Sequence, residues 1–242
     1  MTRWLFLLCA LAMVVAARAG AQAPRTPPQP IVPQDVVAFL DQAVSEAMAR
    51  DNVAGVVASV VIDGKPAIHR GWGKAALDPT RHMDGEQTLV RIGSIGKVMT
   101  WILVLQQAEE GRLDLDADIN TQLRADIRVA PGPGRAVTLR DLMAHRGGFE
   151  DRAFGHLFAN SAADVLPPER WVMTRQPARV RPAGTASSYS NFATALAGVA
   201  AVHASGTRDY PTRIETRLVQ PHGMTSSTAR APDPPPADRP AP

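Results

Sequence analysis

A serine and a lysine three residues apart, Ser94 and Lys97, lie within the stretch RIGSIGKVMTW, residues 91–101. On a helix this spacing places both side chains on one face, about one turn apart. A serine hydroxyl can attack a carbonyl carbon when a neighbouring group takes its proton. If Ser94 begins a helix, its hydroxyl and backbone N–H lie at the positive end of the helix dipole, where a forming oxyanion is stabilised. The pair therefore predicts acyl transfer through a serine nucleophile.

Two other chemistries fit this stretch poorly. A Walker-type phosphate loop needs a glycine five residues before its Gly-Lys pair and a Ser or Thr directly after it. Those positions hold Arg91 and Val98. A Ser-His-Asp site built on a Gly-x-Ser-x-Gly turn is also disfavoured, because Ile92 stands where the first glycine belongs.

A second candidate segment is GTASSYSNFA, residues 184–193. On an extended chain Tyr189 and Asn191 point the same way, while Ser190 between them points back. A phenol held near a cationic lysine can lose its proton, and an asparagine amide can orient a substrate amide. The alternative is that this tyrosine and asparagine only precede a helix, with Ser190 or Asn191 as its cap.

The helix that carries Lys97 is predicted at residues 94–111, ending at Gly111. Apolar residues cover most of its circumference, so we expect a buried central helix. A buried lysine can serve as a base, since burial disfavours its charged form. Lysine otherwise occurs only at Lys65 and Lys74 in an arginine-rich chain, which also indicates proton chemistry at position 97.

The remaining pattern predicts an α/β chain. Apolar residues recur at helical spacing in residues 35–52, with Asp35 as the cap, and β-branched residues flank an Asp63-Gly64 turn in a hairpin at residues 55–75. The stretch VTLRDLMAHRGGF predicts a short helix closed by Gly147-Gly148. Further helices are expected near residues 164–175, 191–204 and 208–219.

The N-terminal 21 residues predict a secretory signal peptide: Arg3, then the apolar run WLFLLCALAMVVAA, then small residues. We expect cleavage after Ala21, with Ala19 and Ala23 as alternative sites and an uncleaved anchor as the other possibility. The only cysteine, Cys9, would leave with this segment, so no disulfide or thiol chemistry is expected. The pattern favours a secreted or periplasmic protein with no membrane contact after cleavage.

Composition and charge exclude other classes. An apolar content of 45% in 242 residues is ordinary for a globular core. The formal net charge of +3 includes Arg3 and Arg18 of the predicted signal. Basic and acidic residues are interleaved without an aromatic platform, which argues against nucleic-acid binding. The six histidines form no His-x-His or His-Glu-x-x-His pattern, so no metal site is expected.

Four segments together resemble the serine β-lactamase and penicillin-binding protein superfamily, above all its class C, D-alanyl-D-alanine carboxypeptidase and esterase-like branch. They are GSIGKVMTW, LRDLMAHRGGFED, PARVRPAGTASSYSNFATALAGVA and VQPHGMTSST, in the family's order and spacing. The resemblance covers roughly residues 35–228. It implies an α/β (α+β) fold, with helices packed on an antiparallel sheet.

The resemblance also implies roles for individual residues. Ser94 would be the acylated nucleophile, Lys97 its proton-accepting partner, Tyr189 a general base or proton relay, and Asn191 a substrate-orienting amide. His145, in MAHRGGF, matches a family turn in which the histidine is usually structural. No metal or organic cofactor is implied, and we expect a monomer acting on a small-molecule or peptidoglycan-type substrate.

One family element has no match. Members carry a Lys- or His-x-Gly motif on a strand that faces the nucleophile and supplies a second oxyanion N–H, whereas His222-Gly223-Met224 resembles a different family loop. We therefore expect an incomplete domain at residues 35–228 without its C-terminal strands, after a Pro-rich leader at 22–34 and before a disordered Pro-rich tail at 229–242. Losing one oxyanion donor costs about 10²- to 10³-fold in rate. The alternative function is a catalytically inactive, truncated remnant that binds an envelope partner.

Overall fold

The computed structural model of this chain describes residues 31–150, 164–207 and 209–230. It divides into two compact units, Met1–Thr88 and Leu89–Pro242, which we call the N-terminal and C-terminal units. The predicted signal peptide, most of the predicted leader and nearly all of the predicted tail lie outside the described residues. None of the helices in the described ranges combines the length and apolar character that crossing a bilayer demands.

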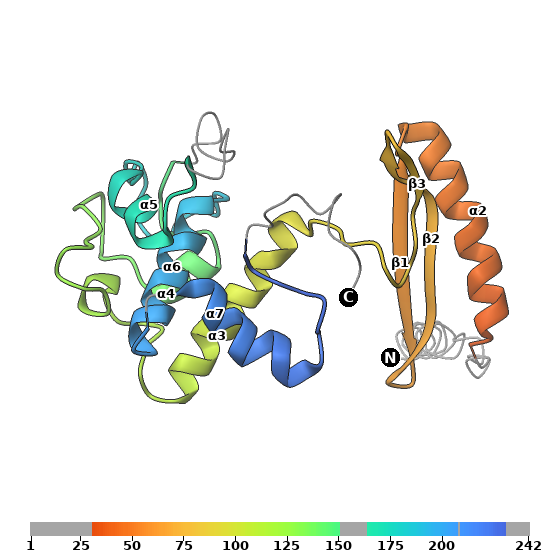
Figure 1. Ribbon diagram of the computed structural model, residues 1–242. Coiled ribbons are helices and arrows are strands. Elements are labelled where there is room, and N and C mark those ends of the chain that lie inside the picture. Colours follow the sequence, from red (N-terminus) through yellow and green to blue (C-terminus); the bar gives the residue numbers. More distant parts are fainter. Residues whose placement is uncertain (1–30, 151–163, 208, 231–242) are drawn as a thin grey trace, which may run out of the picture. The chain divides into compact units, whose positions relative to one another are not determined.

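The N-terminal unit contains one described helix and a three-stranded antiparallel sheet in the order β1-β2-β3 (Figure 1). Their bounds are α2 (Pro33–Asp51), β1 (Gly55–Ile62), β2 (Lys65–Leu77) and β3 (Thr80–His82). The predicted hairpin is confirmed, and Asp63 and Gly64 at its turn have φ of 50° and 74°, as a tight two-residue turn requires. The short strand β3 was not predicted.

The start of α2 differs from the prediction. The helix begins at Pro33 behind Val32, which forms no side-chain cap, and Asp35 lies inside the first turn. A proline at the first helical position has a preset φ and no N–H that needs a partner, so no cap at Asp35 is required. The helix thus starts within the predicted leader.

Polar contacts attach α2 to the sheet. Asp41 accepts a hydrogen bond from Trp72 Nε1 at 2.8 Å and pairs with Arg70 Nε at 2.8 Å. Among residues 31–88, Ile68 is the only buried hydrophobic side chain. The described part of this unit therefore has very little apolar core of its own.

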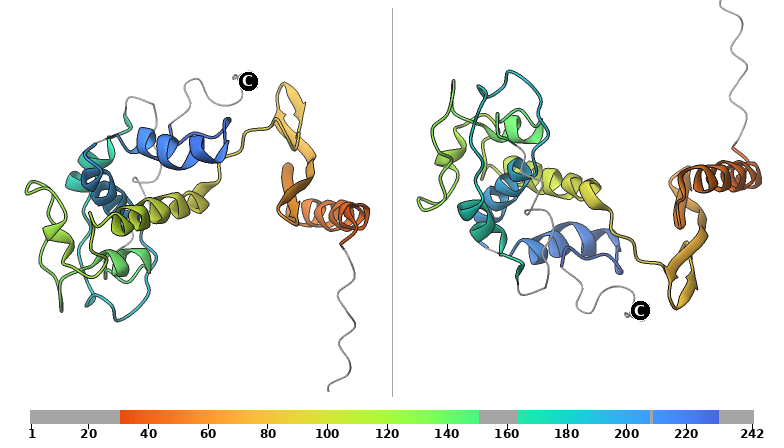
Figure 2. Two further views of the ribbon diagram at one scale, coloured as in Figure 1. Left: turned by 90° about the horizontal axis from the view of Figure 1, so that it is seen from below. Right: turned by 90° about the horizontal axis from the view of Figure 1, so that it is seen from above.

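The C-terminal unit is helical in its described part. Its elements are η1 (Gly93–Gly96), α3 (Lys97–Glu109), η2 (Ile119–Thr121), α4 (Leu139–Met143), α5 (Pro168–Thr174), α6 (Asn191–Ala204), α7 (Tyr210–Ile214), η4 (Glu215–Val219) and η5 (Gln220–His222). The almost fully buried α6 packs against α3, and α7 contacts both (Figure 2). Small residues on α6 allow α3 and α7 to approach it closely. A Cβ built at Gly198 would lie 3.2 Å from Tyr210 and 3.4 Å from Thr100.

The helix predicted at 94–111 forms, but it is not buried all round. A tight 3₁₀ turn, η1, leads into α3, which ends two residues before Gly111. One face is buried through Leu103 and Val104, whereas Ile95 is 70% and Val98 51% exposed. The prediction of a buried central helix is therefore wrong for the described structure, because α6 and α7 cover only one side of α3.

The short helix α4 also ends earlier than predicted. Thr138 and Asp141 form a reciprocal capping box at its start, and Arg135 donates two hydrogen bonds to Asp141, at 2.6 and 2.8 Å. The helix stops at Met143 rather than at Gly147-Gly148, since the chain turns sharply at His145, whose φ is 55°. The end of α4 thus leads directly to this histidine.

The other predicted helices lie close to their expected positions. The one near residues 164–175 is α5, and the one near 208–219 is divided into α7 and η4. The helix at 191–204 is confirmed as α6, with Ser190 rather than Asn191 as its cap. The predicted α/β (α+β) class is confirmed by this combination of helices and an antiparallel sheet.

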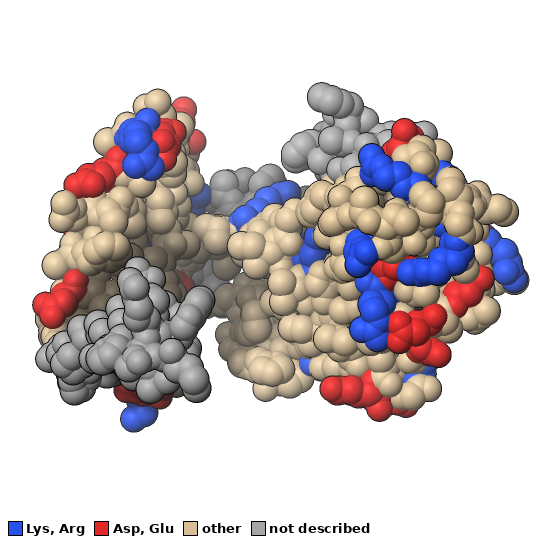
Figure 3. Space-filling view, turned by 180° about the vertical axis from the view of Figure 1, so that it is seen from behind, with Lys and Arg blue, Asp and Glu red and all other residues tan. Residues whose placement is uncertain are grey.

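Opposite charges lie side by side on the C-terminal unit. Figure 3 shows basic and acidic side chains next to one another on the face in view. Arg140 pairs with Asp116 at 2.7 Å, and Arg124 with Asp126 at 2.5 Å. Arg230 likewise pairs with Glu215 at 3.1 Å, so the described chain stays attached to this unit at its last residue. The charges on this surface are therefore largely compensated locally.

The capping network of α4 leads to a prediction about stability. Burial raises the pKa of Asp141, but hydrogen bonds from Arg135 and Thr138 outweigh it, so the net pKa lies below the ordinary value. A lowered folded-state pKa contributes stability above the ordinary pKa and loses it as the pH falls through the folded value. We expect Asp141→Asn to lower the free energy of unfolding by about 2–3 kcal/mol near pH 7, and this difference to shrink as the pH falls below about 4, measured by urea denaturation.

Asp116→Asn is the matched control. The Asp116–Arg140 pair is exposed on both sides, at 67% and 62%, and solvent screens such pairs. Its loss should change the urea midpoint little. Equal effects from the two variants would show that the capping network contributes no more than a surface ion pair.

Candidate active site

Four side chains singled out by the sequence meet at the start of α3. Lys97 Nζ donates a hydrogen bond to Ser94 Oγ at 3.1 Å and another to Asn191 Oδ1 at 2.8 Å. Tyr189 OH donates to Ser94 Oγ at 2.7 Å. The serine oxygen therefore lies between an amine and a phenol, although Ser94 and Tyr189 are 95 positions apart in the sequence.

The backbone before α3 explains the position of the serine. Gly93 has a φ of 53°, in the left-handed region that glycine adopts without strain. The following 3₁₀ turn, Gly93–Gly96, passes into α3 at Lys97. Ser94 consequently lies at the N-terminal end of the helix, where the helix dipole favours negative charge.

Tyr189 and Asn191 are positioned by the start of α6. Ser190 is buried, and its Oγ accepts a hydrogen bond from the Ala193 N–H at 3.1 Å, which caps the helix. With Ser190 turned inward, its two neighbours both reach the junction of η1 and α3, at Ser94 and Lys97. This is the alternation that the sequence predicts, and it occurs together with the capping role that was the alternative.

His145 holds the tyrosine segment from behind. Its carbonyl oxygen accepts from the Ser188 N–H at 2.7 Å, and its Nδ1 accepts from the Ser190 N–H at 3.2 Å. Its ring lies 4.6 Å from the Tyr189 ring, between centroids, and 6.2 Å from that of Trp101. These are the contacts of a positioning residue. Trp101 was missed by the sequence reasoning, although its place one turn after Lys97 on the same helix was a usable signal.

The lysine amine and its partners are more exposed to solvent than the sequence predicts. Lys97 Nζ lies 4.8 Å from the centroid of the Tyr189 ring, within the range of a cation–π interaction. Lys97 is only half-buried, Ser94 is exposed, and Tyr189 is 46% exposed. The described residues bring the three groups together without enclosing them, because α3 is covered on one side only.

A metal centre finds no support in the described ranges. No group of three or more His, Cys, Asp or Glu side chains there could hold a metal ion. The polar groups around Ser94 are instead an amine, a phenol and an amide. This combination suits proton transfer and hydrogen bonding.

Comparison with known proteins places the chain in a family. The family model described as Beta-lactamase matches residues 40–241. The chain belongs to the Beta-lactamase family. Among its relatives, the D-alanyl-D-alanine-carboxypeptidase/endopeptidase AmpH of Escherichia coli (strain K12) is 25% identical over 203 residues, which are 83% of this chain and 52% of AmpH. Esterase EstB of Burkholderia gladioli is 32% identical over 114 residues, 47% of this chain and 29% of EstB.

Solved structures of this family have the same fold. A class C β-lactamase in complex with cefoxitin matches with a TM-score of 0.65 and 25% identity, covering 84% of this chain and 53% of that one. The octameric penicillin-binding protein homologue from Pyrococcus abyssi matches with a TM-score of 0.66 and 26% identity, covering 78% and 43%. The predicted superfamily and β-lactamase-like fold are thereby confirmed. The chain spans about half the length of AmpH.

The contacts of His145 lead to a second prediction. His145→Phe keeps an aromatic ring beside Tyr189 but removes the acceptor for the Ser190 N–H. We expect the free energy of unfolding to fall by about 1–2 kcal/mol, since the N–H of the buried Ser190 loses its partner. His145→Asn should lose less, because asparagine tolerates the left-handed backbone and carries an acceptor oxygen at a similar reach. A smaller loss for His145→Phe than for His145→Asn in urea denaturation would mean that ring packing, and not the hydrogen bond, determines the contribution.

Proposed function

We propose that this chain is a serine hydrolase, which transfers the acyl group of its substrate to Ser94 and then to water. The observation that carries the proposal is the contact of Ser94 Oγ with both Lys97 Nζ, at 3.1 Å, and Tyr189 OH, at 2.7 Å. A weak hydroxyl nucleophile needs a proton acceptor at this reach. Membership of the Beta-lactamase family supports the same chemistry.

The geometry suggests the following sequence of steps. The Ser94 proton passes to Lys97 or Tyr189 while Oγ forms a bond to the substrate carbonyl carbon, and the carbonyl electron pair moves onto oxygen. The backbone N–H of Ser94, at the start of α3, stabilises this oxyanion. Collapse breaks the bond to the leaving group, which takes the proton from Lys97 or Tyr189. Water then attacks the Ser94 ester, releasing the acid and restoring the hydroxyl.

Asn191 orients the amine and the substrate. Its Oδ1 accepts a hydrogen bond from Lys97 at 2.8 Å, which holds the amine one turn along the helix from Ser94. The side-chain amide therefore lies beside the reacting groups, where it can also bond to a substrate amide. Fixed geometry of this kind lowers the entropy cost of reaching the transition state.

The substrate belongs, in this proposal, to the β-lactam, D-alanyl peptide or small-ester class. The names of AmpH, as a carboxypeptidase and endopeptidase, and of EstB, as an esterase, support that range. Reaction through serine, amine and phenol requires no metal or organic cofactor. The predicted signal at residues 1–21 supports a location outside the cytoplasm, in the periplasm or secreted, where a peptidoglycan-type substrate would be met. We propose that it acts there as a monomer.

Loss of the nucleophile tests the proposal directly. The wild-type chain should bind a fluorescent penicillin covalently or release p-nitrophenol from p-nitrophenyl acetate. Ser94→Ala should abolish both, because no oxygen remains to be acylated, while changing the urea midpoint little. Ser187→Ala is the matched control, since its Oγ only donates to the Ala144 carbonyl at 3.3 Å. A folded wild-type protein with neither label nor turnover would instead favour a non-catalytic envelope-binding role.

Substitution of the proton-transfer groups tests which of them accepts the proton. Lys97→Arg places a permanently charged group here that cannot take up a proton, so we expect acylation to slow by about 10²- to 10⁴-fold. Tyr189→Phe keeps the ring near Lys97 and removes only the hydroxyl. A loss of about 10²-fold in single-turnover labelling would identify the phenol as a participant. A variant that keeps the wild-type rate excludes that residue from proton transfer.

A further inference from the structure

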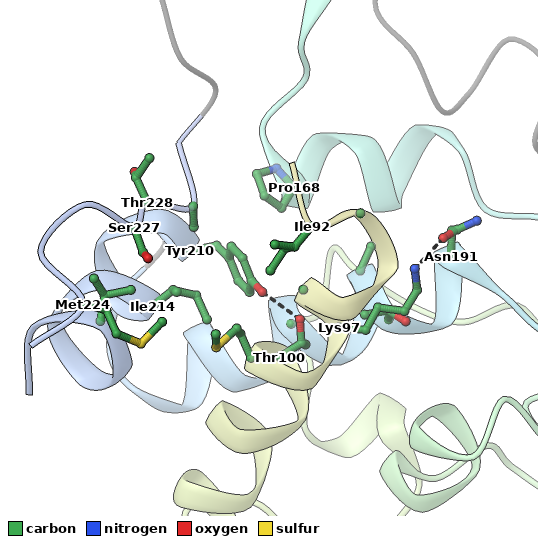
Figure 4. A pocket seen from close by; sticks show the side chains of 18 residues that line it. Ile92, Lys97, Thr100, Pro168, Asn191, Tyr210, Ile214, Met224, Ser227 and Thr228 are labelled. Carbon is green, nitrogen blue, oxygen red and sulfur yellow. Dashed lines mark hydrogen bonds between the residues drawn. The ribbon is translucent and has the colours of Figure 1, made fainter. Parts of the chain in front are cut away.

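A cavity of about 560 Å³ lies beside the serine turn in the C-terminal unit (Figure 4). Its walls come from η1, α3, the start of α5, α6, α7, η4 and the segment after η5. The apolar side chains and small residues that form most of its surface include Met99, Ala195, Gly198, Ile214, Val219 and Met224. Its volume lies within the range of sites that hold small organic molecules, about 300–1,000 Å³.

The polar groups of this cavity select against charged ligands. Thr100 and Tyr210 bond to each other through their hydroxyls at 2.7 Å, and burial raises the pKa of Tyr210, so its phenol stays neutral. Lys97 is the one basic or acidic residue among those lining the cavity, and its amine is directed to Asn191 and Ser94. Figure 4 shows Lys97 and Asn191 at the end of the cavity away from Met224. An uncharged, apolar group is therefore the chemistry that fits.

The cavity also adjoins the residues on both sides of the nucleophile. Gly93 and Gly96 line it and flank Ser94 in sequence. A Cβ built at Gly93 would meet no atom within 4 Å, and one at Gly96 would meet only Ile92 Cδ1, at 3.9 Å. The backbone of the serine turn is thus uncovered, and a flexible chain attached to a carbonyl at Ser94 has room to pass across it.

The direction of proton transfer distinguishes the two halves of an ester. The leaving group takes its proton from Lys97, at one end of the cavity, or from the exposed Tyr189, which does not line it, so the leaving group lies at or outside that end. The acyl half stays bonded to Ser94, next to Gly93 and Gly96. We propose that the cavity binds the acyl chain of the substrate, and that the preferred substrates are neutral esters with an aliphatic acyl chain of several carbons. This inference rests on the proposed serine hydrolase function.

A series of p-nitrophenyl esters from acetate through butyrate and hexanoate to octanoate tests the inference in the wild-type chain. Each methylene transferred into the cavity should raise kcat/KM by roughly fourfold until the cavity is filled. Ala195→Phe places a large ring in the cavity and should lower the hexanoate-to-acetate ratio at least tenfold. Leu105→Phe, on α3 outside the cavity, should leave that ratio unchanged. If hydrolysis depends on Ser94 but kcat/KM stays constant or falls along the series, the inference is overturned and the proposed function remains intact.

A binding measurement tests the acyl-chain assignment of the cavity separately from the proposed hydrolase function. The chain with Ser94→Ala, labelled with ¹³C at its methionine methyl groups, is titrated with 2-octanone, which cannot be hydrolysed. The signals of Met99 and Met224, which line the cavity, should shift with saturation, whereas those of Met143 and Met173 should not. Absence of shifts at saturating ketone would overturn the acyl-chain assignment whatever the esterase result. Shifts at both methionines, without ester hydrolysis by the wild type, would leave the cavity as an apolar-ligand site and reject the hydrolase.

Discussion

The position of one amine determines the geometry of the whole site. Lys97 Nζ bonds to Ser94 on its own helix and to Asn191, 94 positions away at the start of α6, and it lies 4.8 Å from the Tyr189 ring. A lysine amine that donates to two acceptors and lies over one aromatic ring needs no carboxylate partner. Since no acidic side chain forms part of this set of contacts, no carboxylate competes with Ser94 for the amine, which can exchange a proton with the serine and stabilise a developing oxyanion once protonated.

The geometry around the amine depends on polar contacts in the segments behind it. Arg135 and Thr138 fix Asp141, Asp141 caps the five-residue helix α4, and α4 ends where His145 takes a left-handed backbone conformation. His145 in turn holds the segment that carries Tyr189, through the Ser188 and Ser190 N–H groups. A helix as short as α4 has little stability of its own. The phenol is thus positioned by a continuous series of capping interactions, and not by packing alone.

The sequence alone could predict what depends on local spacing. The i, i+3 relation of Ser94 and Lys97 and the two-residue spacing of Tyr189 and Asn191 were sufficient to nominate the site, because they fix which side chains share a face. The end of α4 and the exposure of Ser94 were not predictable. The first depends on a left-handed residue that is not glycine, and the second on which side of α3 is covered by α6 and α7. The cavity is lined by segments from the serine turn to the chain after η5, which are far apart in the sequence, so no local pattern indicates it.

The exposure of the reacting groups and the apolar cavity bear on the same physical problem. Water around Ser94 weakens its electrostatic interactions with Lys97 and Tyr189, whereas the chemistry requires them to be strong. An aliphatic acyl chain lying across Gly93 and Gly96 would displace water from this turn, and its burial would supply the free energy for doing so. The described site, open before binding, would then become more reactive because an apolar substrate covers it. A short or charged substrate would leave the turn hydrated, so the structure links the choice of substrate to the activation of the serine.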